Sequence, residues 1–482
     1  MNFTAITTEI MVTVLMLITL VMDLVMAKGA SRRPVAYLSA AGLAGILVYT
    51  VSQYHTGESI YFFGQLFIVD NYSLFFKQLF IVGMIFTIMF SLDYAERCIA
   101  YSGEFYSLLL SALLGMCVMS SANDFITTFV GLELMTVSFY ILVGMRTDEP
   151  DASASSEAAV KYLDVGAAST AVMLYGISLV YGASGSLDFL TICRNVHLYY
   201  AAGLAGSVMV MAGFFFKLSV IPFHMWAPDV YEGAPTPVTA LLAMGSKAAG
   251  IAVFMRVIYT AFPFIAAYWL PLLAVFSALC MIFGNIMAIR QKDVKRMLAY
   301  SSIAQAGYMM AGFAAADLAG LKAVMFSAML YVFANVGAFV VLCIVDAERG
   351  GTTHDDDTGL AQASPLLAAV MTVCLLSMAG IPPTAGFAGK IYIFTAAVDS
   401  GLLWLAVIGF VMSMISVYYY LLVTKAMYRD LGDDEEWRAE KMSVPMLARV
   451  SALAAVIATL AIGICPETLA MITNVASETF MR

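Results

Sequence analysis

Apolar residues run through the chain in segments of about 20 residues, and short polar stretches separate them. A helix needs about 20 apolar residues to cross the roughly 30 Å of hydrocarbon in a bilayer, and a lipid-exposed strand would leave backbone groups unpaired. The pattern therefore predicts an all-α polytopic membrane protein with about 14 transmembrane helices. The predicted spans are 7–27, 34–52, 71–93, 105–121, 123–145, 158–183, 199–225, 236–261, 269–290, 297–315, 321–346, 365–395, 402–427 and 446–472.

Two of these apolar segments are interrupted by an Ile-Pro step. The stretch LSVIPFHMW covers residues 218–226, and MAGIPPTAGF covers residues 378–387, five spans further along. Five is odd, so the two spans run in opposite directions, as in an inverted repeat. Because proline has no N–H, Pro222 frees the carbonyl of Leu218, and the later proline pair frees the two carbonyls four residues before it. Protein or water must satisfy such groups at membrane depth, which predicts two proline-broken helices beside a hydrated interior.

The composition excludes a soluble globular domain, because 62% of the residues are hydrophobic and only 12% are charged. Lys and Arg in short loops mark the inner side of a membrane, whereas acids contribute little. Alternate loops hold these cations: Lys28, Arg32 and Arg33; Arg97; Arg146; Arg290, Lys292, Lys295 and Arg296; Arg349; Lys425, Arg429, Arg438 and Lys441. With an even number of spans, both termini are predicted on the outer, periplasm-like side.

Cofactor chemistry has no sequence signal in this chain. The seven cysteines form no C-x-x-C pair, and the four histidines have no metal-ligand spacing. There is no G-x-G-x-x-G motif and no phosphate-binding loop. We therefore expect no metal, iron–sulfur cluster, structural disulfide or nucleotide site here, and no role in binding nucleic acid.

Four ionisable residues lie inside predicted spans. Glu133 is the only ionisable residue in the stretch 127–145, and Lys217, Lys247 and Lys390 have similar apolar surroundings. A charge at the bilayer centre costs roughly 2.5–3.5 kcal/mol on insertion scales, so four unpaired charges would cost on the order of 10 kcal/mol. That rivals the stability of a typical domain, about 5–15 kcal/mol. These side chains must face a wet interior or one another.

The alternative to a functional role is an ion pair between helices, or a lysine that reaches from a helix end to the interface. For Lys161, near the start of its span, this alternative carries more weight than for the four central residues. It is the preferred interpretation for Lys77, Lys322 and Arg256. His224, beside Trp226, fits interfacial packing about as well as proton relay. Lysine suits proton transfer because desolvation can bring its reference pKa of about 10.4 down by several units, whereas arginine stays protonated.

Four long motifs give the chain a family resemblance. They are GLELMTVSFYILVG (131–144), FFFKLSVIPFHMWAPDVYEGAPTPVTALLAMGSKAAG (214–250), GNIMAIRQKDVKRMLAYSSIAQAGYM (284–309) and SMAGIPPTAGFAGKIYIF (377–394). In this order they resemble the antiporter-like proton-channel subunits of respiratory complex I, and the match spans about residues 105–430. The resemblance implies proton pumping driven by quinone reduction in other subunits. The chain would be a non-redox subunit of a proton-translocating NADH:quinone oxidoreductase in the bacterial cytoplasmic (inner) membrane.

The resemblance also implies two inverted five-helix repeats and a set of functional residues. The implied divisions are 1–104 for three N-terminal helices, 105–262 and 269–430 for the two repeats, and 446–472 for the last helix. By motif, Glu133 sets the proton affinity of Lys217, Lys161 modulates that pair, Lys247 lies at the centre of the membrane, Lys390 lies toward the exit and His224 links the two halves. The length of the loop 146–161 determines the register and direction of Lys161.

The expected partners are other complex I subunits, above all neighbouring antiporter-like membrane subunits, together with membrane lipids. NADH, FMN, iron–sulfur clusters and quinone are expected in those partner subunits. Two alternatives stay open: a subunit of a multisubunit sodium/proton antiporter, and a subunit of a ferredoxin- or F420-dependent relative of complex I. A purely structural scaffold is disfavoured by the uncompensated lysines inside the spans.

Overall fold

The computed structural model describes residues 6–27, 29–54, 59–146, 151–195, 200–431, 440–477 and 480. Lys28 and Arg438, which the loop-charge count includes, lie outside the described residues. The first helices are α1 (Thr7–Val25), α2 (Arg33–Ser52), α3 (Asn71–Cys98), α4 (Ser102–Ser121), α5 (Phe125–Val143), α6 (Asp151–Ser184), α7 (Phe189–Asn195), α8 (Tyr200–Leu218) and α9 (Trp226–Gly233). The next are α10 (Thr236–Leu241), η3 (Leu242–Ser246), α11 (Lys247–Arg256), η4 (Val257–Ala261), η5 (Pro263–Ile265), α12 (Ala266–Ala288), α13 (Val294–Ala314) and α14 (Leu318–Arg349). The last are α15 (Leu360–Ala363), α16 (Pro365–Ala379), α17 (Ala385–Asp399), α18 (Leu403–Met427), α19 (Met446–Ile464) and α20 (Pro466–Ser477).

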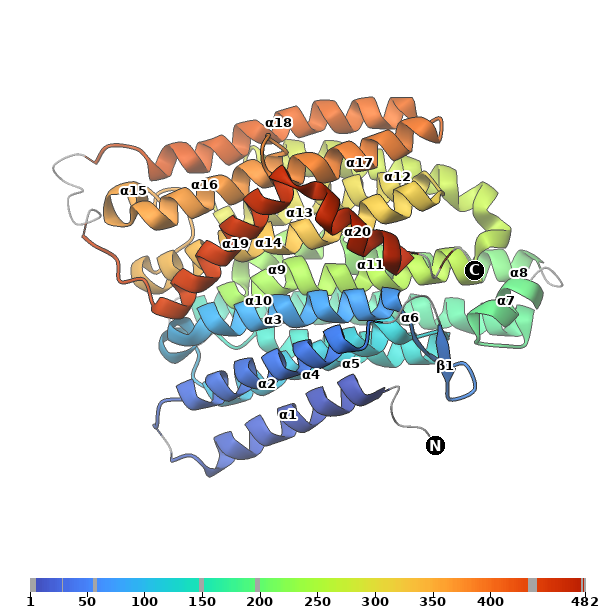
Figure 1. The fold of residues 1–482 in the computed structure, drawn as a ribbon, viewed down its shortest axis with the longest axis horizontal. Coiled ribbons are helices and arrows are strands. Elements are labelled where there is room, and N and C mark those ends of the chain that lie inside the picture. Colours follow the sequence, from blue (N-terminus) through green and yellow to red (C-terminus); the bar gives the residue numbers. More distant parts are fainter. Residues whose placement is uncertain are drawn as a thin grey trace.

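Long helices lie side by side along one direction and form a single bundle (Figure 1). Among the described residues, twelve helical segments are long and apolar enough to cross a membrane. The prediction of a helical polytopic membrane protein is therefore confirmed. One small sheet departs from the all-α expectation: β1 (Ile60–Phe62) pairs antiparallel with β2 (Phe67–Val69) in the connection between α2 and α3.

The interior of the bundle is formed by helices from the middle of the chain. In the most apolar part of the segment Thr236–Ala261 every residue is buried, and in α14 the share is 89%, against 33% for α1 and for α2. Figure 1 shows α1 and α2 along one edge and α18 along the opposite edge. Side chains on α10, α11, α13 and α14 therefore lie inside protein, away from the surrounding lipid.

Both helices with an Ile-Pro step are interrupted, as predicted. The first break separates α8, which ends at Leu218, from α9, which begins at Trp226. The second separates α16, which ends at Ala379, from α17, which begins at Ala385. A further break was not predicted: the segment 446–472 divides into α19 and α20 at Pro466, where the missing N–H prevents the helix from continuing.

The segment Thr236–Ala261 is a helix with two wide turns. The π-helical turn η3 lies between α10 and α11, and η4 follows α11. Lys247 is the first residue of α11, directly after η3. π-helical turns are rare overall, and those that occur often lie at functional sites. The backbone therefore indicates a functional site near Lys247 independently of the charge of this residue.

Two of the cations that were assigned a structural role pair with acids from other helices. Lys77 of α3 lies 2.7 Å from Glu9 of α1, and both side chains are buried. Arg256 of α11 forms two bonds of 2.9 and 3.1 Å to Asp70, the residue that caps α3. The ion-pair interpretation is confirmed for these two cations, and the pairs fix α1 and α11 to α3.

Candidate functional site

Lys217 lies in the last turn of α8, one residue before the first break. Its side chain is buried, with 1% of its surface exposed. The ammonium donates to the Thr136 hydroxyl at 2.7 Å and to the Tyr162 hydroxyl at 3.3 Å, and it lies 5.8 Å from the centre of the Tyr162 ring. The described partners of this cation are therefore neutral hydroxyl groups.

Glu133 lies on α5 about one turn before Thr136. Its carboxylate accepts a hydrogen bond of 2.9 Å from Thr170 of α6. Glu133 and Lys217, both described, form no ion pair within 4 Å. A small cavity of about 10 Å3, lined by Thr136, Thr170 and Lys217, lies between these elements. Hydroxyl groups rather than a direct contact thus lie between the carboxylate and the ammonium.

Lys247 is buried, with 4% of its surface exposed. Its ammonium donates to the Ser302 hydroxyl at 2.7 Å and to the Ser302 carbonyl at 3.0 Å, both on α13. One turn after Lys247, a Cβ placed on Gly250 would lie 3.0 Å from Leu218 and 3.6 Å from Cγ of Lys217. The absence of a side chain at Gly250 therefore lets α11 pack closely against the end of α8, next to Lys217.

Two cavities connect the surroundings of Lys247 with those of Lys390. One of about 10 Å3 is lined by Lys247 and Ser302, and one of about 40 Å3 is lined by Lys390. Gln305, Met309 and Tyr331 line both cavities. A water needs about 10–15 Å3 of such space and polar partners, so the larger cavity has room for a water and the smaller one lies at the lower limit.

The side chain of Lys390 bonds to the backbone at the second helix break. Its ammonium donates to the carbonyl of Ala379 at 2.7 Å and to the Ser413 hydroxyl at 2.7 Å, and it lies 4.7 Å from the centre of the Tyr308 ring. The other freed carbonyl, that of Met378, accepts from Gln305 at 3.0 Å. Protein groups therefore satisfy both freed carbonyls at this break, and the hydrated interior stays a prediction there.

His224 lies in the first break, between α8 and α9. Its ring is half-buried, its Nδ1 has no hydrogen-bond partner among the described residues, and its neighbour Met225 is 77% exposed. The described contacts do not join His224 to Lys217 or Lys247. The role of His224 as a link between the two halves therefore stays a prediction.

Lys161 lies apart from the buried lysines. Its side chain is 47% exposed and pairs with Glu157 at 2.8 Å and with Asp229 at 3.1 Å. This geometry favours the ion-pair alternative for Lys161. Its neighbour in sequence, Tyr162, is the residue that reaches Lys217.

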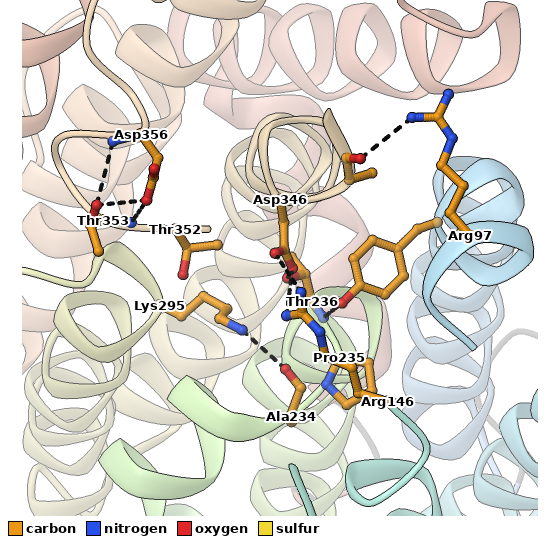
Figure 2. Close-up of polar contacts among 12 residues, drawn as sticks. Arg97, Arg146, Ala234, Pro235, Thr236, Lys295, Asp346, Thr352, Thr353 and Asp356 are labelled. Atoms are coloured by element: carbon orange, nitrogen blue, oxygen red, sulfur yellow. Dashed lines mark hydrogen bonds and ion pairs between the residues drawn. The ribbon is translucent and has the colours of Figure 1, made fainter. Parts of the chain in front are cut away.

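Lys161 lines a charged vestibule, a cavity of about 470 Å3 between α6, α9, α13, α14 and the loop 350–356. Figure 2 shows polar contacts beside this cavity. Arg146 lies 3.2 Å from Asp346, and Thr236 donates to the same carboxylate at 2.5 Å. Lys295 points into this region and donates to the carbonyl of Ala234 at 3.1 Å. Acids and bases both line the vestibule, and its volume leaves room for water between them.

The loop after α14 lines the vestibule and carries a buried carboxyl group with a raised pKa, that of Asp357. Asp357 is fully buried, and neither of its oxygens has a hydrogen-bond partner among the described residues. Burial raises the pKa of Asp357 to about 8, Arg349 opposes this rise, and Asp356 and Asp293 add to it. At neutral pH Asp357 is therefore mostly protonated and adds little charge to the loop.

Several polar residues of the site carried no sequence signal of their own. Lys295 looked like an inner-loop cation, yet it is buried, with 2% of its surface exposed. Ser302 and Gln305 are uncharged residues of α13. This helix is long enough to cross a membrane, but it is less hydrophobic than the twelve segments named above. The low hydropathy of α13, a buried helix, was the one available indication that it holds polar partners.

A family described as "NADH:quinone oxidoreductase/Mrp antiporter, TM" matches residues 122–416, which is more than half of the chain. The chain belongs to this family. A relative from Heliobacterium modesticaldum, NADH-quinone oxidoreductase subunit N, is 47% identical over 99% of this chain and 99% of its own length. Another from Nostoc, NAD(P)H-quinone oxidoreductase subunit 2, is 42% identical over 85% of this chain and 78% of its own length.

Solved structures of the antiporter family have the same fold. A chain of respiratory complex I from Thermus thermophilus is 31% identical, with a TM-score of 0.81 over 96% of this chain and 99% of that one. A chain of the Mrp complex from Dietzia is 20% identical, with a TM-score of 0.86 over 98% of this chain and 97% of that one, and shares the fold. The resemblance inferred from the four motifs is confirmed. Within the family, the WAPDVYEGAPTPVTA form of the second motif and the length of 482 residues are most like subunit N.

Proposed function

We propose that the chain is a proton-translocating membrane-arm subunit of an NADH-quinone oxidoreductase and moves protons along the row Glu133, Lys217, Lys247 and Lys390. One observation carries the proposal: three buried lysines whose described partners are neutral hydroxyl and carbonyl groups. A lysine locked in an ion pair holds its proton, whereas a lysine among neutral dipoles in a low-dielectric interior can release it. The cavities around Gln305 supply room for water between the last two lysines.

The order of the row follows from the contacts. Glu133 acts on Lys217 across Thr136 and Thr170, Lys217 adjoins Lys247 where α8 meets α11, and Gln305 separates Lys247 from Lys390. Lys161 and His224 belong to the proposal as peripheral groups, Lys161 at the charged vestibule and His224 at the first break. Quinone reduction in partner subunits would drive the movement, and the redox cofactors would be held there.

The proposal includes fourteen spans and two inverted repeats, over 105–262 and 269–430, with 1–104 and 446–472 outside them. Two features support it. Helices occupy every predicted span, and the helices at Pro222 and at Pro382 are both broken, five predicted spans apart. Two broken segments at corresponding places in inverted halves are typical of a transport site.

The antiporter alternative shares the fold, as the Mrp chain shows. Co-purification separates the two functions. We expect the affinity-tagged chain, solubilised gently from its native membrane, to bring flavin- and iron–sulfur-containing proteins that oxidise NADH. Isolation with hydrophilic partners that lack flavin and iron–sulfur centres would instead favour the multisubunit antiporter, and a ferredoxin-oxidising assembly would favour the relatives of complex I.

The proposed orientation places residues 289–293 on the inner side and both termini on the outer side of a cytoplasmic membrane. Single cysteines at Gln291, in the turn between α12 and α13, and at Ser400, in the turn between α17 and α18, test it. We expect a membrane-impermeant maleimide to label Ser400→Cys in intact cells and Gln291→Cys only in inverted vesicles. The reverse labelling would reject the orientation.

A further inference from the structure

A cavity of about 260 Å3 lies where α14, α17 and α20 meet, apart from the lysine row. We call it the helix-end cavity; polar side chains from all three helices line it, among them Lys322, Asp399 and Asn474. Lys322 lies about one turn from the start of α14, and Asp399 is the last residue of α17. In a membrane-spanning bundle, the ends of such helices lie at the level of the lipid headgroups.

The bend at Pro466 creates this cavity. Figure 1 shows α19 and α20 meeting at an angle, so that α20 turns across the bundle instead of continuing along it. A second buried apolar cluster, made by Phe326, Leu330, Ala385 and Leu469, packs α20 against α14 and α17. The cavity is therefore a fixed feature of the fold, open at the surface of the chain.

The helix-end cavity presents two opposite charges that do not meet. Lys322 is half-buried and makes no hydrogen bond or ion pair with any residue that the structure describes. The same holds for the exposed carboxylate of Asp399, although both side chains line the same cavity. Of the two structural interpretations given for Lys322, the lysine that reaches from a helix end fits these contacts, and it leaves a partly desolvated cation that gains from an anionic ligand.

An apolar surface continues from the cavity along α17. The rings of Phe326 and Tyr392 meet edge to face, with 5.0 Å between their centres, and both line the cavity. Further along α17, Phe387 and Ile391 are 38% and 43% exposed and lie one turn apart on the same face. Charge at the helix ends followed by an exposed apolar stripe matches the two parts of a phospholipid.

We propose that the helix-end cavity binds a phospholipid with a primary-amine headgroup, of the ethanolamine type. Lys322 binds the phosphate, Asp399 accepts hydrogen bonds from the headgroup ammonium, and an acyl chain lies along the stripe of Phe387 and Ile391. An ethanolamine headgroup carries a negative and a positive charge, as the lining of the cavity does, and its ammonium donates hydrogen bonds that a choline group lacks. A lipid with an anionic glycerol headgroup would place its charge against Lys322 and leave Asp399 without a partner.

Native mass spectrometry of the chain in its purified complex tests this proposal. The complex is delipidated and then exposed to mixed micelles that hold phosphatidylethanolamine, phosphatidylglycerol and phosphatidylcholine in equal amounts. A charge-assisted hydrogen bond contributes roughly 1.5–3 kcal/mol, so we expect Lys322→Ala to retain about tenfold less of all three lipids than the wild type. Asp399→Asn is expected to shift the preference from the ethanolamine to the glycerol lipid. Lys425→Ala, which removes an exposed lysine at the end of α18, is the matched control.

Equal lipid retention by Lys322→Ala and Lys425→Ala would overturn the proposal. An Asp399→Asn complex with the headgroup preference of the wild type would remove Asp399 from the site and contradict the choice of ethanolamine. Each variant is compared at matched subunit content, so a loss of assembly is visible in the same spectra. The test is independent of pumping, so failure of the lipid site leaves the proposed function untouched.

Discussion

Lys247→Ala is expected to lower the rate of proton uptake into inverted membrane vesicles about tenfold or more, because a positioned proton-transfer group contributes at least that much. Lys247 is the one charged residue lining the cavity between Leu218 and Ser302, and its ammonium has only the hydroxyl and carbonyl of Ser302 as described polar partners. Without it, the path from Lys217 to Gln305 loses the group that accepts the proton and passes it on.

Lys247→Arg distinguishes proton transfer from a structural charge. Arginine keeps the positive charge and can bond Ser302, but it does not release its proton at accessible pH. We therefore expect Lys247→Arg to pump as poorly as Lys247→Ala, with both complexes fully assembled. Lys425→Ala, at an exposed helix end, should pump as the wild type does. Recovery of pumping in Lys247→Arg would mean that the site needs only a cation.

Glu133→Ala is expected to have the second largest effect, through Lys217. In the proposed mechanism the carboxylate favours the protonated form of that lysine from across Thr136 and Thr170. Loss of an interaction worth about 1.4 kcal/mol changes proton occupancy about tenfold. Proton uptake by vesicles should fall by a similar factor, and Glu133→Asp, which keeps the charge on a shorter side chain, should retain much of the activity.

Glu133→Gln separates the charge from the hydrogen bond. The amide oxygen can still accept from the Thr170 hydroxyl, so a purely structural role of Glu133 would leave this variant active. The electrostatic role requires the charge, and we expect Glu133→Gln to pump as poorly as Glu133→Ala. Glu467→Ala on the exposed side of α20 is the control for loss of a glutamate. Wild-type pumping by Glu133→Gln would assign the residue to packing.

The course of the helices was predictable because it depends on local properties of the chain. The length of an apolar run determines whether it crosses a bilayer, and Pro222 and Pro382 interrupt their helices through missing hydrogen bonds. The same rule applied to Pro466 would have predicted the bend between α19 and α20. The π-helical turn before Lys247 had no such signal, because it arises from packing within the bundle.

The partners of the charged residues were much less predictable. Lys161 and Lys217 look alike in sequence, since each is a lysine in an apolar helix, yet one pairs with acids at a vestibule and the other is buried among hydroxyls. Their difference depends on which face of a helix meets which neighbour. The uncharged partners Ser302 and Gln305 were missed for the same reason, because a serine or glutamine becomes important only through the lysine beside it.

The most direct test of the central claim measures proton uptake and NADH oxidation simultaneously in vesicles that contain the fully assembled Glu133→Ala/Lys247→Ala complex. Because the proposed row carries protons that are coupled to quinone reduction, we predict that uptake falls about tenfold or more and that turnover falls no further than uptake does. Uptake and turnover both at the wild-type level would contradict the account, and would show that these buried charges only hold the helices together.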